Sequence, residues 1–152
     1  MKKLIIGATG SIGSAVSRNI QKSGGKTHLV GRNEKEISSL AGELGSTFTV
    51  ADVLNENFSD KILNDLGEEE IDGLAFCVGS IDLKPLKLTR KSDYMQCFNL
   101  NLISATEIIR ACHEKLKKNL LKLKYEKNYY YYLFSFNKQL RTSSRIRQQR
   151  KF

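Results

Sequence analysis

Residues 3–13 read Lys3-Leu4-Ile5-Ile6-Gly7-Ala8-Thr9-Gly10-Ser11-Ile12-Gly13, an apolar run followed by a glycine at every third position. An apolar run that ends at glycine is typical of a buried parallel strand, and the apolar residues that follow recur at helical spacing. Glycines in such a turn allow a sharp bend, close approach of the backbone to a pyrophosphate, and tight packing of helix on sheet. The stretch therefore predicts a strand–turn–helix unit whose helix amides face a diphosphate.

The same alternation continues along the chain. Further strands are predicted at residues 27–30, 47–50 and 71–78, and further helices at residues 33–44, 58–66 and 92–118. Asn33 followed by Glu36 predicts a capping box at the start of the second helix. The apolar face predicted for the last helix consists of Phe98, Leu102, Ala105, Ile108, Ile109 and Cys112. This order predicts an α/β fold, a Rossmann-like doubly wound parallel sheet in three α/β/α layers, with strand order 3-2-1-4.

Charge and glycine content both change along the chain. The net charge is +9, yet residues 115–152 carry 12 Lys and Arg against the single acid Glu126, and all 11 glycines lie before residue 80. We therefore expect a domain at residues 1–118 and, at 119–152, a basic Tyr- and Lys-rich tail that is not a domain. The tail is rich in the residues that AT-rich codons encode, and Lys117-Lys118-Asn119 can be encoded by an unbroken run of adenines. Both features favour a frameshift product. A native tail that binds nucleic acid or an anionic membrane is the alternative.

The end of the second predicted strand indicates which dinucleotide is bound. Many such folds place an acid there to hold a ribose 2′-hydroxyl, whereas this chain has Gly31 followed by Arg32. Glycine removes an anion that would repel a 2′-phosphate, and arginine offers a bidentate donor for one. The sequence therefore favours NADP over NAD.

Together these residues resemble the N-terminal part of the short-chain dehydrogenase/reductase family, over about residues 1–118. The resemblance implies that Asp52 contacts the adenine, that Gly79 lies in the segment after the fourth strand, and that Asn101 is the counterpart of the catalytic asparagine, with Asn99 as the rival. Ser11 stands where the family usually has glycine, and the asparagines that usually precede Gly79 are absent. The expected cofactor-binding residues are Gly7, Thr9, Gly10, Ser11, Ile12, Gly13, Arg32, Asp52 and Gly79.

The family's catalytic Tyr-x-x-x-Lys is not found. None of the six tyrosines is followed by lysine four positions later, and the C-terminal strands of the family's sheet are missing from the pattern. The resemblance implies an NAD(P)(H)-dependent oxidoreductase that interconverts a small-molecule carbonyl and an alcohol, with homo-oligomeric intact relatives. This chain is expected to hold the cofactor-binding half and to be inactive alone. A non-catalytic NADP-binding module is the alternative.

Other residues exclude several function classes. Cys77, Cys97 and Cys112 lack metal-ligand spacing and are expected as reduced thiols in the body of the fold, and no metal site is predicted. No apolar run reaches the length of a membrane span, so a cytoplasmic protein is expected. His28, within the second strand, is interpreted as a packed or edge histidine.

Overall fold

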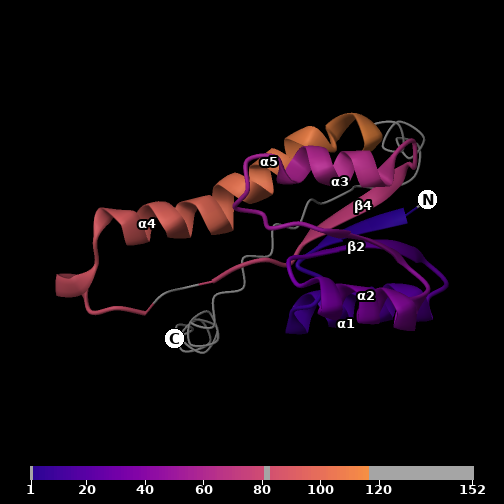
Figure 1. The fold of residues 1–152 in the computed structure, drawn as a ribbon, viewed down its shortest axis with the longest axis horizontal. Coiled ribbons are helices and arrows are strands. Elements are labelled where there is room, and N and C mark those ends of the chain that lie inside the picture. Colours follow the sequence, from indigo (N-terminus) through magenta and orange to yellow (C-terminus); the bar gives the residue numbers. More distant parts are fainter. Residues whose placement is uncertain (1, 81–82, 117–152) are drawn as a thin grey trace, which may run out of the picture.

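The computed structural model describes residues 2–80 and 83–116, and these form alternating strands and helices (Figure 1). The elements in chain order are β1 (Lys2–Ile6), α1 (Ser11–Lys22), β2 (Lys26–Gly31), α2 (Glu34–Leu44), β3 (Thr47–Val50), α3 (Phe58–Leu66), β4 (Ile71–Phe76), the 3-10 turn η1 (Leu86–Leu88), α4 (Lys91–Phe98), the π-helical turn η2 (Asn99–Ile103) and α5 (Ser104–Ala111). The predicted boundary near residue 118 and the tail at 119–152 lie outside the described residues.

The four strands are parallel and lie in the order β3-β2-β1-β4. Helices α1 and α2 cover one face of the sheet, and α3 and α5 cover the other (Figure 1). The predicted α/β class, three layers and strand order are confirmed. Because the four strands in the described residues point the same way, the loops after β1, β2, β3 and β4 meet at one edge of the sheet, where such folds bind their ligands.

Strand β1 explains how one sheet supports two cores. Leu4 and Ile6 are fully buried against α3 and α5, whereas Ile5, also fully buried, faces the α1 and α2 side. Side chains of a strand alternate between faces, so a continuous apolar run is what a strand covered on both sides requires. Each such side chain contributes about 1.5–3 kcal/mol by leaving water.

One of the two hydrogen bonds of the capping box predicted at the start of α2 is present. The Oδ1 atom of Asn33 accepts a hydrogen bond from the backbone N–H of Glu36 at 3.2 Å. The carboxylate of Glu36 accepts from the side-chain Nδ2 of Asn33 at 3.1 Å, whereas a capping box would use the backbone N–H of Asn33. The helix ends at Gly45 with φ +59°, a left-handed conformation that favours glycine. Both ends of α2 are therefore set by local sequence.

The helix predicted as continuous from residue 92 to 118 is interrupted. Helix α4 buries no residue, the π-helical turn η2 follows it, and α5 then packs beside α3. Phe98 and Leu102 are 57% and 42% exposed, so the predicted apolar face is wrong at these two positions. Ala105, Ile108 and Cys112 are buried, as predicted, and Ile109 is half-buried. Strand β4 also ends at Phe76 rather than residue 78.

The turn from β1 into α1 depends on two glycines that touch. A Cβ atom on Gly13 would lie 2.2 Å from the carbonyl oxygen of Gly7 and 2.8 Å from the Cα of Ala8. Gly7 has φ +78°, and a Cβ there would lie 2.8 Å from Cγ2 of Val78. Side chains are therefore excluded at both positions, which lets α1 begin directly against the strand it follows. Among the described residues, no helix is both long and apolar enough to span a membrane.

Substitution of Gly13 tests this contact. We expect Gly13→Ala to lower the free energy of unfolding by about 3 kcal/mol, because the new methyl group meets backbone atoms that cannot move without opening the turn. Denaturant unfolding of the full chain, followed by circular dichroism, measures the change.

Gly42→Ala is the matched control. Gly42 lies within α2, and a Cβ there would meet nothing within 4 Å. The same substitution is expected to raise the free energy of unfolding there by about 0.5–1 kcal/mol. A loss at Gly13 no larger than the change at Gly42 would contradict the contact.

Candidate functional site

The loop between β1 and α1 leaves backbone donors open toward the sheet edge. The amides of Gly7 and Ala8 both donate to the carbonyl oxygen of Val30 at 2.9 Å, and the amide of Gly10 donates to Gly7 at 3.1 Å. Beyond Gly10 no side chain caps α1, so the N–H groups of its first turn have no side-chain acceptor. The loop is thus fixed to β2, while the positive end of α1 stays available to an anion.

Gly10 differs from its neighbouring glycines. The nearest atom to a Cβ on Gly10 would be the carbonyl oxygen of Gly7 at 3.4 Å, an ordinary contact, so the protein itself does not require glycine there. Next to it Ser11 is exposed, and Ile12 is 42% exposed despite being apolar. Open space over bare backbone, beside an apolar side chain that the fold does not cover, fits a diphosphate lying across the loop.

The ends of β2 and β3 form an open depression of about 380 Å³. Arg32 and Asp52 both line it, with Val50 and Phe58 among their neighbours. Arg32 is exposed. One carboxylate oxygen of Asp52 accepts the amide of Leu54 at 3.0 Å, which fixes the turn after β3. The two residues predicted at the adenosine end of the site are therefore brought together.

Thr9 lines a different cavity. It opens between α1 and α2, has a volume of about 600 Å³, and is also bordered by Arg18, Asn33 and Glu43. Arg18 donates to both carboxylate oxygens of Glu43, at 2.8 and 2.9 Å, and this pairing lowers the pKa of Glu43. The predicted site residues thus share one edge of the sheet without sharing one enclosed cavity.

Gly31 has a packing role that the sequence analysis missed. A Cβ atom there would lie 3.2 Å from Cδ1 of Ile37 and 3.3 Å from Cγ2 of Thr9, tighter than a normal contact. The position is therefore closed to a side chain unless Ile37 or Thr9 shifts. A glycine inside a strand signals such a close approach, but the sequence does not identify the neighbours.

Asn101 connects η2 to the segment after β4. Its Nδ2 atom donates to the carbonyl oxygens of Ser80 and Cys97, both at 2.9 Å, and its Oδ1 accepts the amide of Ser80 at 3.1 Å. A Cβ on Gly79 would lie 3.1 Å from that Oδ1. The structure therefore joins Gly79 and Asn101 in one contact, whereas Asn99 is exposed.

These hydrogen bonds also explain the π-helical turn. In a regular α-helix the carbonyl of Cys97 accepts the backbone N–H four residues later. Here the side chain of Asn101 donates to that carbonyl, and the amide of Ser104 reaches back five residues to Asn99. π-helical turns occur frequently at functional sites. Sequence patterns did not reveal this turn, because it depends on a contact with Ser80.

Two titratable groups in the segment that follows β4, Cys77 and Asp93, have shifted pKa values. Burial raises the pKa of the Cys77 thiol, which keeps it protonated. Lys84 and the backbone N–H of Arg90 donate to Asp93 and lower its pKa.

All three cysteines are free thiols, as predicted, but Cys97 is exposed rather than in the body of the fold. Within residues 2–80 and 83–116, no cluster of His, Cys, Asp and Glu could hold a metal ion.

Comparison with known proteins gives one family. Residues 2–120 match the sequence profile described as short chain dehydrogenase. A 3-oxoacyl-[acyl-carrier-protein] reductase, FabG of Rickettsia bellii (strain RML369-C), is 27% identical over 117 residues, which are 76% of this chain and 48% of that protein. The chain therefore spans about half the length of this curated relative.

Solved structures agree with the fold. Serine dehydrogenase from Escherichia coli superposes with a TM-score of 0.70 at 24% identity, over 78% of this chain and 57% of its own. The closed form of a serine dehydrogenase complexed with NADP+ has a TM-score of 0.71, also at 24% identity, over 78% of this chain and 50% of its own.

Replacing Asn101 tests its bridging role. Asn101→Leu keeps the size of the side chain and removes its hydrogen bonds to Ser80 and Cys97. We expect the free energy of unfolding to fall by about 0.5–1.5 kcal/mol, because the side-chain hydrogen bonds to Ser80 and Cys97 are lost, and the amide of Ser80 to exchange faster with solvent.

Asn99→Leu is the control, since the Asn99 side chain is exposed. A change of at most about 0.5 kcal/mol is expected there. Hydrogen exchange measured by NMR gives the exchange rate of the Ser80 amide in both variants. Equal effects at the two positions would show that Asn101 does not hold the β4 exit.

Proposed function

Because the chain belongs to the short-chain dehydrogenase family, we propose that residues 1–118 are the nicotinamide dinucleotide-binding half of an oxidoreductase that interconverts a carbonyl and an alcohol. The observation that carries the proposal is the contact between Gly7 and Gly13, which sets the uncapped end of α1 at the carboxyl edge of the sheet. When bound, the dinucleotide supplies the hydride donor or acceptor. This chain's own residues bind and orient it.

Three parts of the edge would hold three parts of the cofactor. The first-turn amides of α1, over the bare backbone of Gly10, would bind the diphosphate. Arg32 and Asp52, which border one depression, would hold the adenosine end. Gly79 lies beside Asn101 at the exit of β4, where the backbone would face the nicotinamide end. Thr9 and Ser11 would line the loop between them.

NADP is the preferred form of the cofactor in this proposal. NAD-binding relatives of this architecture hold the ribose 2′-hydroxyl with an acid at the end of the second strand. A side chain at position 31 would need Ile37 or Thr9 to shift, and Arg32 next to it is exposed and has no acid beside it at 31. The guanidinium of Arg32 would donate charge-assisted hydrogen bonds to a 2′-phosphate, and no carboxylate at position 31 would repel that phosphate.

Asn101 would act as a positioning residue. Its Nδ2 donates to Ser80 and Cys97 and its Oδ1 accepts from Ser80, so it would order the loop after β4. None of the six tyrosines has lysine at the fourth position after it, the pair that would lower the pKa of a proton-shuttling tyrosine. We therefore expect the 152-residue chain to bind the dinucleotide without turnover. A non-catalytic dinucleotide-binding module is the second candidate, favoured by the same missing pair.

Substitution of Arg32 tests the cofactor preference. Arg32→Ala is expected to weaken NADPH binding roughly 10- to 100-fold, because a charge-assisted hydrogen bond to phosphate is lost. NADH binding should change by about threefold or less, because NADH has no 2′-phosphate. Quenching or enhancement of nicotinamide fluorescence measures both.

Lys22→Ala is the control. It removes a positive charge at the C-terminal end of α1, where Lys22 is exposed and lies far from the edge proposed to bind the cofactor. The affinities for NADPH and NADH should both stay unchanged in this variant. Equal losses of NADPH and NADH binding in Arg32→Ala would contradict a role for Arg32 in reading the 2′-phosphate.

Turnover is tested directly. NADPH is mixed with the purified chain and a 3-oxoacyl thioester, the carbonyl class named for its Rickettsia relative. We expect fluorescence to report binding while the absorbance of the reduced nicotinamide stays at the rate of a protein-free blank. The full-length Rickettsia bellii reductase serves as the positive control. Oxidation at about one turnover per second or faster would overturn the prediction.

A further inference from the structure

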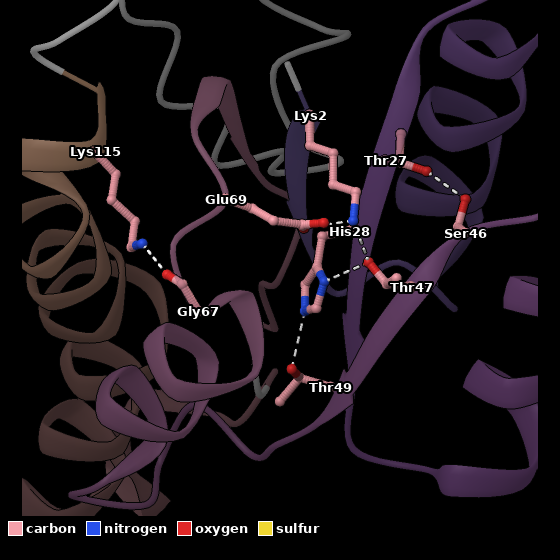
Figure 2. A network of polar contacts seen from close by, with 9 residues as sticks. All are labelled: Lys2, Thr27, His28, Ser46, Thr47, Thr49, Gly67, Glu69 and Lys115. Carbon is pink, nitrogen blue, oxygen red and sulfur yellow. Dashed lines mark hydrogen bonds and ion pairs between the residues drawn. The ribbon is translucent and has the colours of Figure 1, made fainter.

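Side-chain hydrogen bonds cross the sheet at the end opposite the candidate site, and Figure 2 shows those that join Thr47, His28 and Thr49. Lys2 donates to Oγ1 of Thr47 at 3.0 Å, and that oxygen lies 2.8 Å from Nδ1 of His28. Nε2 of His28 lies 2.9 Å from Oγ1 of Thr49, which donates to the carboxylate of Asp65 at 2.6 Å. These hydrogen bonds therefore connect β1 to β3, β3 to β2, and β3 to α3, and all of them are between side chains.

The two ends of the hydrogen-bond chain fix the direction of three of its four bonds. The ammonium of Lys2 can only donate, and the carboxylate of Asp65 can only accept. Since the hydroxyl proton of Thr49 goes to Asp65, the oxygen of Thr49 is left to accept from Nε2–H of His28. Burial and the ammonium of Lys2 lower the pKa of His28 to about 4, so the ring is neutral at pH 7. Its single proton is then on Nε2, and Nδ1 accepts from the hydroxyl of Thr47.

His28 lies in a fully enclosed position between two strands. Its residue is 1% exposed, as is Thr49. Strand β3 has four residues, Thr47–Val50, and pairs with β2 alone among the described strands. Thr27 and Ser46, 2.7 Å apart, add one more side-chain link between the same two strands. A short outer strand is thus held by side-chain bonds in addition to its backbone ladder.

Burial, more than the neighbouring charges, opposes the protonation of His28. Burial and the nearby ammonium of Lys2 lower the pKa of His28 to about 4, while Asp65 of α3 and Glu69 of the turn after α3 act in the other direction. Glu69 is itself paired with Lys2 and lies near Lys26. A proton on Nδ1 would also displace the hydroxyl proton that Thr47 donates there.

We propose that the hydrogen-bond chain from Lys2 to Asp65 is an acid-sensitive latch, which holds β3 in the sheet while His28 is neutral and releases the strand when the ring gains a second proton. Strand β3 runs through Val50 into Asp52, which lines the depression shared with Arg32. Release of β3 therefore loosens one wall of the nucleotide site. This last consequence rests on the proposed function, whereas the latch itself does not.

The direction of the pH effect follows from linkage. A histidine whose pKa is lower in the folded chain stabilises the fold above its unfolded pKa of 6.5, and this contribution is lost as the pH falls from 6.5 toward about 4. The population of molecules with β3 released should rise about ten- to thirtyfold between about pH 7.5 and pH 5.

The experiment compares the full chain with two variants, since the sequence has two histidines. Protection factors of the amides at residues 47–50, corrected for intrinsic exchange at each pH, report release of β3. His28→Gln offers a donor and an acceptor that do not titrate, so protection should stop depending on pH in this range. His113→Gln changes an exposed histidine and should behave as the unmodified chain. The same pH dependence in His28→Gln would overturn the latch.

A second measurement keeps the test valid if His28→Gln does not fold. Nitrogen-15 chemical shifts of the unmodified chain, assigned with His113→Gln, should place the His28 proton on Nε2 and show no second proton above about pH 5. A proton on Nδ1, or protonation near pH 6.5, would overturn the proposal.

The NADPH affinity is measured over the same pH range. If acid weakens NADPH binding more in the unmodified chain than in His28→Gln, the result supports a coupling between the latch and the nucleotide site. Protonation of NADPH itself affects the two proteins equally.

The two proposals fail separately. If the chain binds no NADPH at any pH, the proposed function is wrong, and amide protection at β3 still decides the latch. If NADPH binds and the protection of β3 is the same at both pH values, the latch is wrong and the nucleotide site stands.

Discussion

The fold depends on a contact between two backbone segments without side chains. The carbonyl oxygen of Gly7 and the Cα of Gly13 approach so closely that a methyl group on residue 13 would lie 2.2 Å from that oxygen. This contact fixes the direction in which α1 leaves β1, and hence the position of the uncapped helix end at the sheet edge. It also places the loop where Gly7 and Ala8 both donate to Val30 of β2. The packing of α1 beside α2 and the candidate diphosphate position both follow from this geometry.

Features determined by near neighbours in the sequence were predictable. The parallel order β3-β2-β1-β4 followed from apolar runs that alternate with helical spacing, and the Asn33 cap followed from Glu36 three residues later. The interruption at η2 was not predictable, because it depends on hydrogen bonds from Asn101 to Ser80, 21 positions earlier. For the same reason the exposure of Phe98 contradicted a face that helical periodicity alone had assigned to the core. The residues expected to bind the cofactor lie at the expected edge, but the packing of Thr9 and Ile37 against Gly31 had no signal in local sequence.

Strand β2 serves two different purposes along its length. Its first half carries His28, whose ring bonds to two threonines of β3, and its last residue is Gly31, where a side chain would press against Ile37 and Thr9. Polar bonds therefore hold the outer strand at one end of the sheet, and close backbone packing shapes the candidate site at the other. A buried imidazole is tolerated because each of its nitrogens has a partner, and an unpaired one would cost about 1–3 kcal/mol.

The π-helical turn sets how the segment from α4 to α5 responds to a change in chain length. A π-helical turn contains one residue more than the α-helical turn it replaces. Deleting one residue from Asn99–Ile103 would therefore restore a regular helix while Ala105 and Ile108 keep their orientation toward the core. Inserting one residue into the regular helix of α5 would instead rotate the residues after it by about 100°. The segment should therefore keep its core face through the loss of one residue at the turn, at the cost of the contact between Asn101 and Ser80.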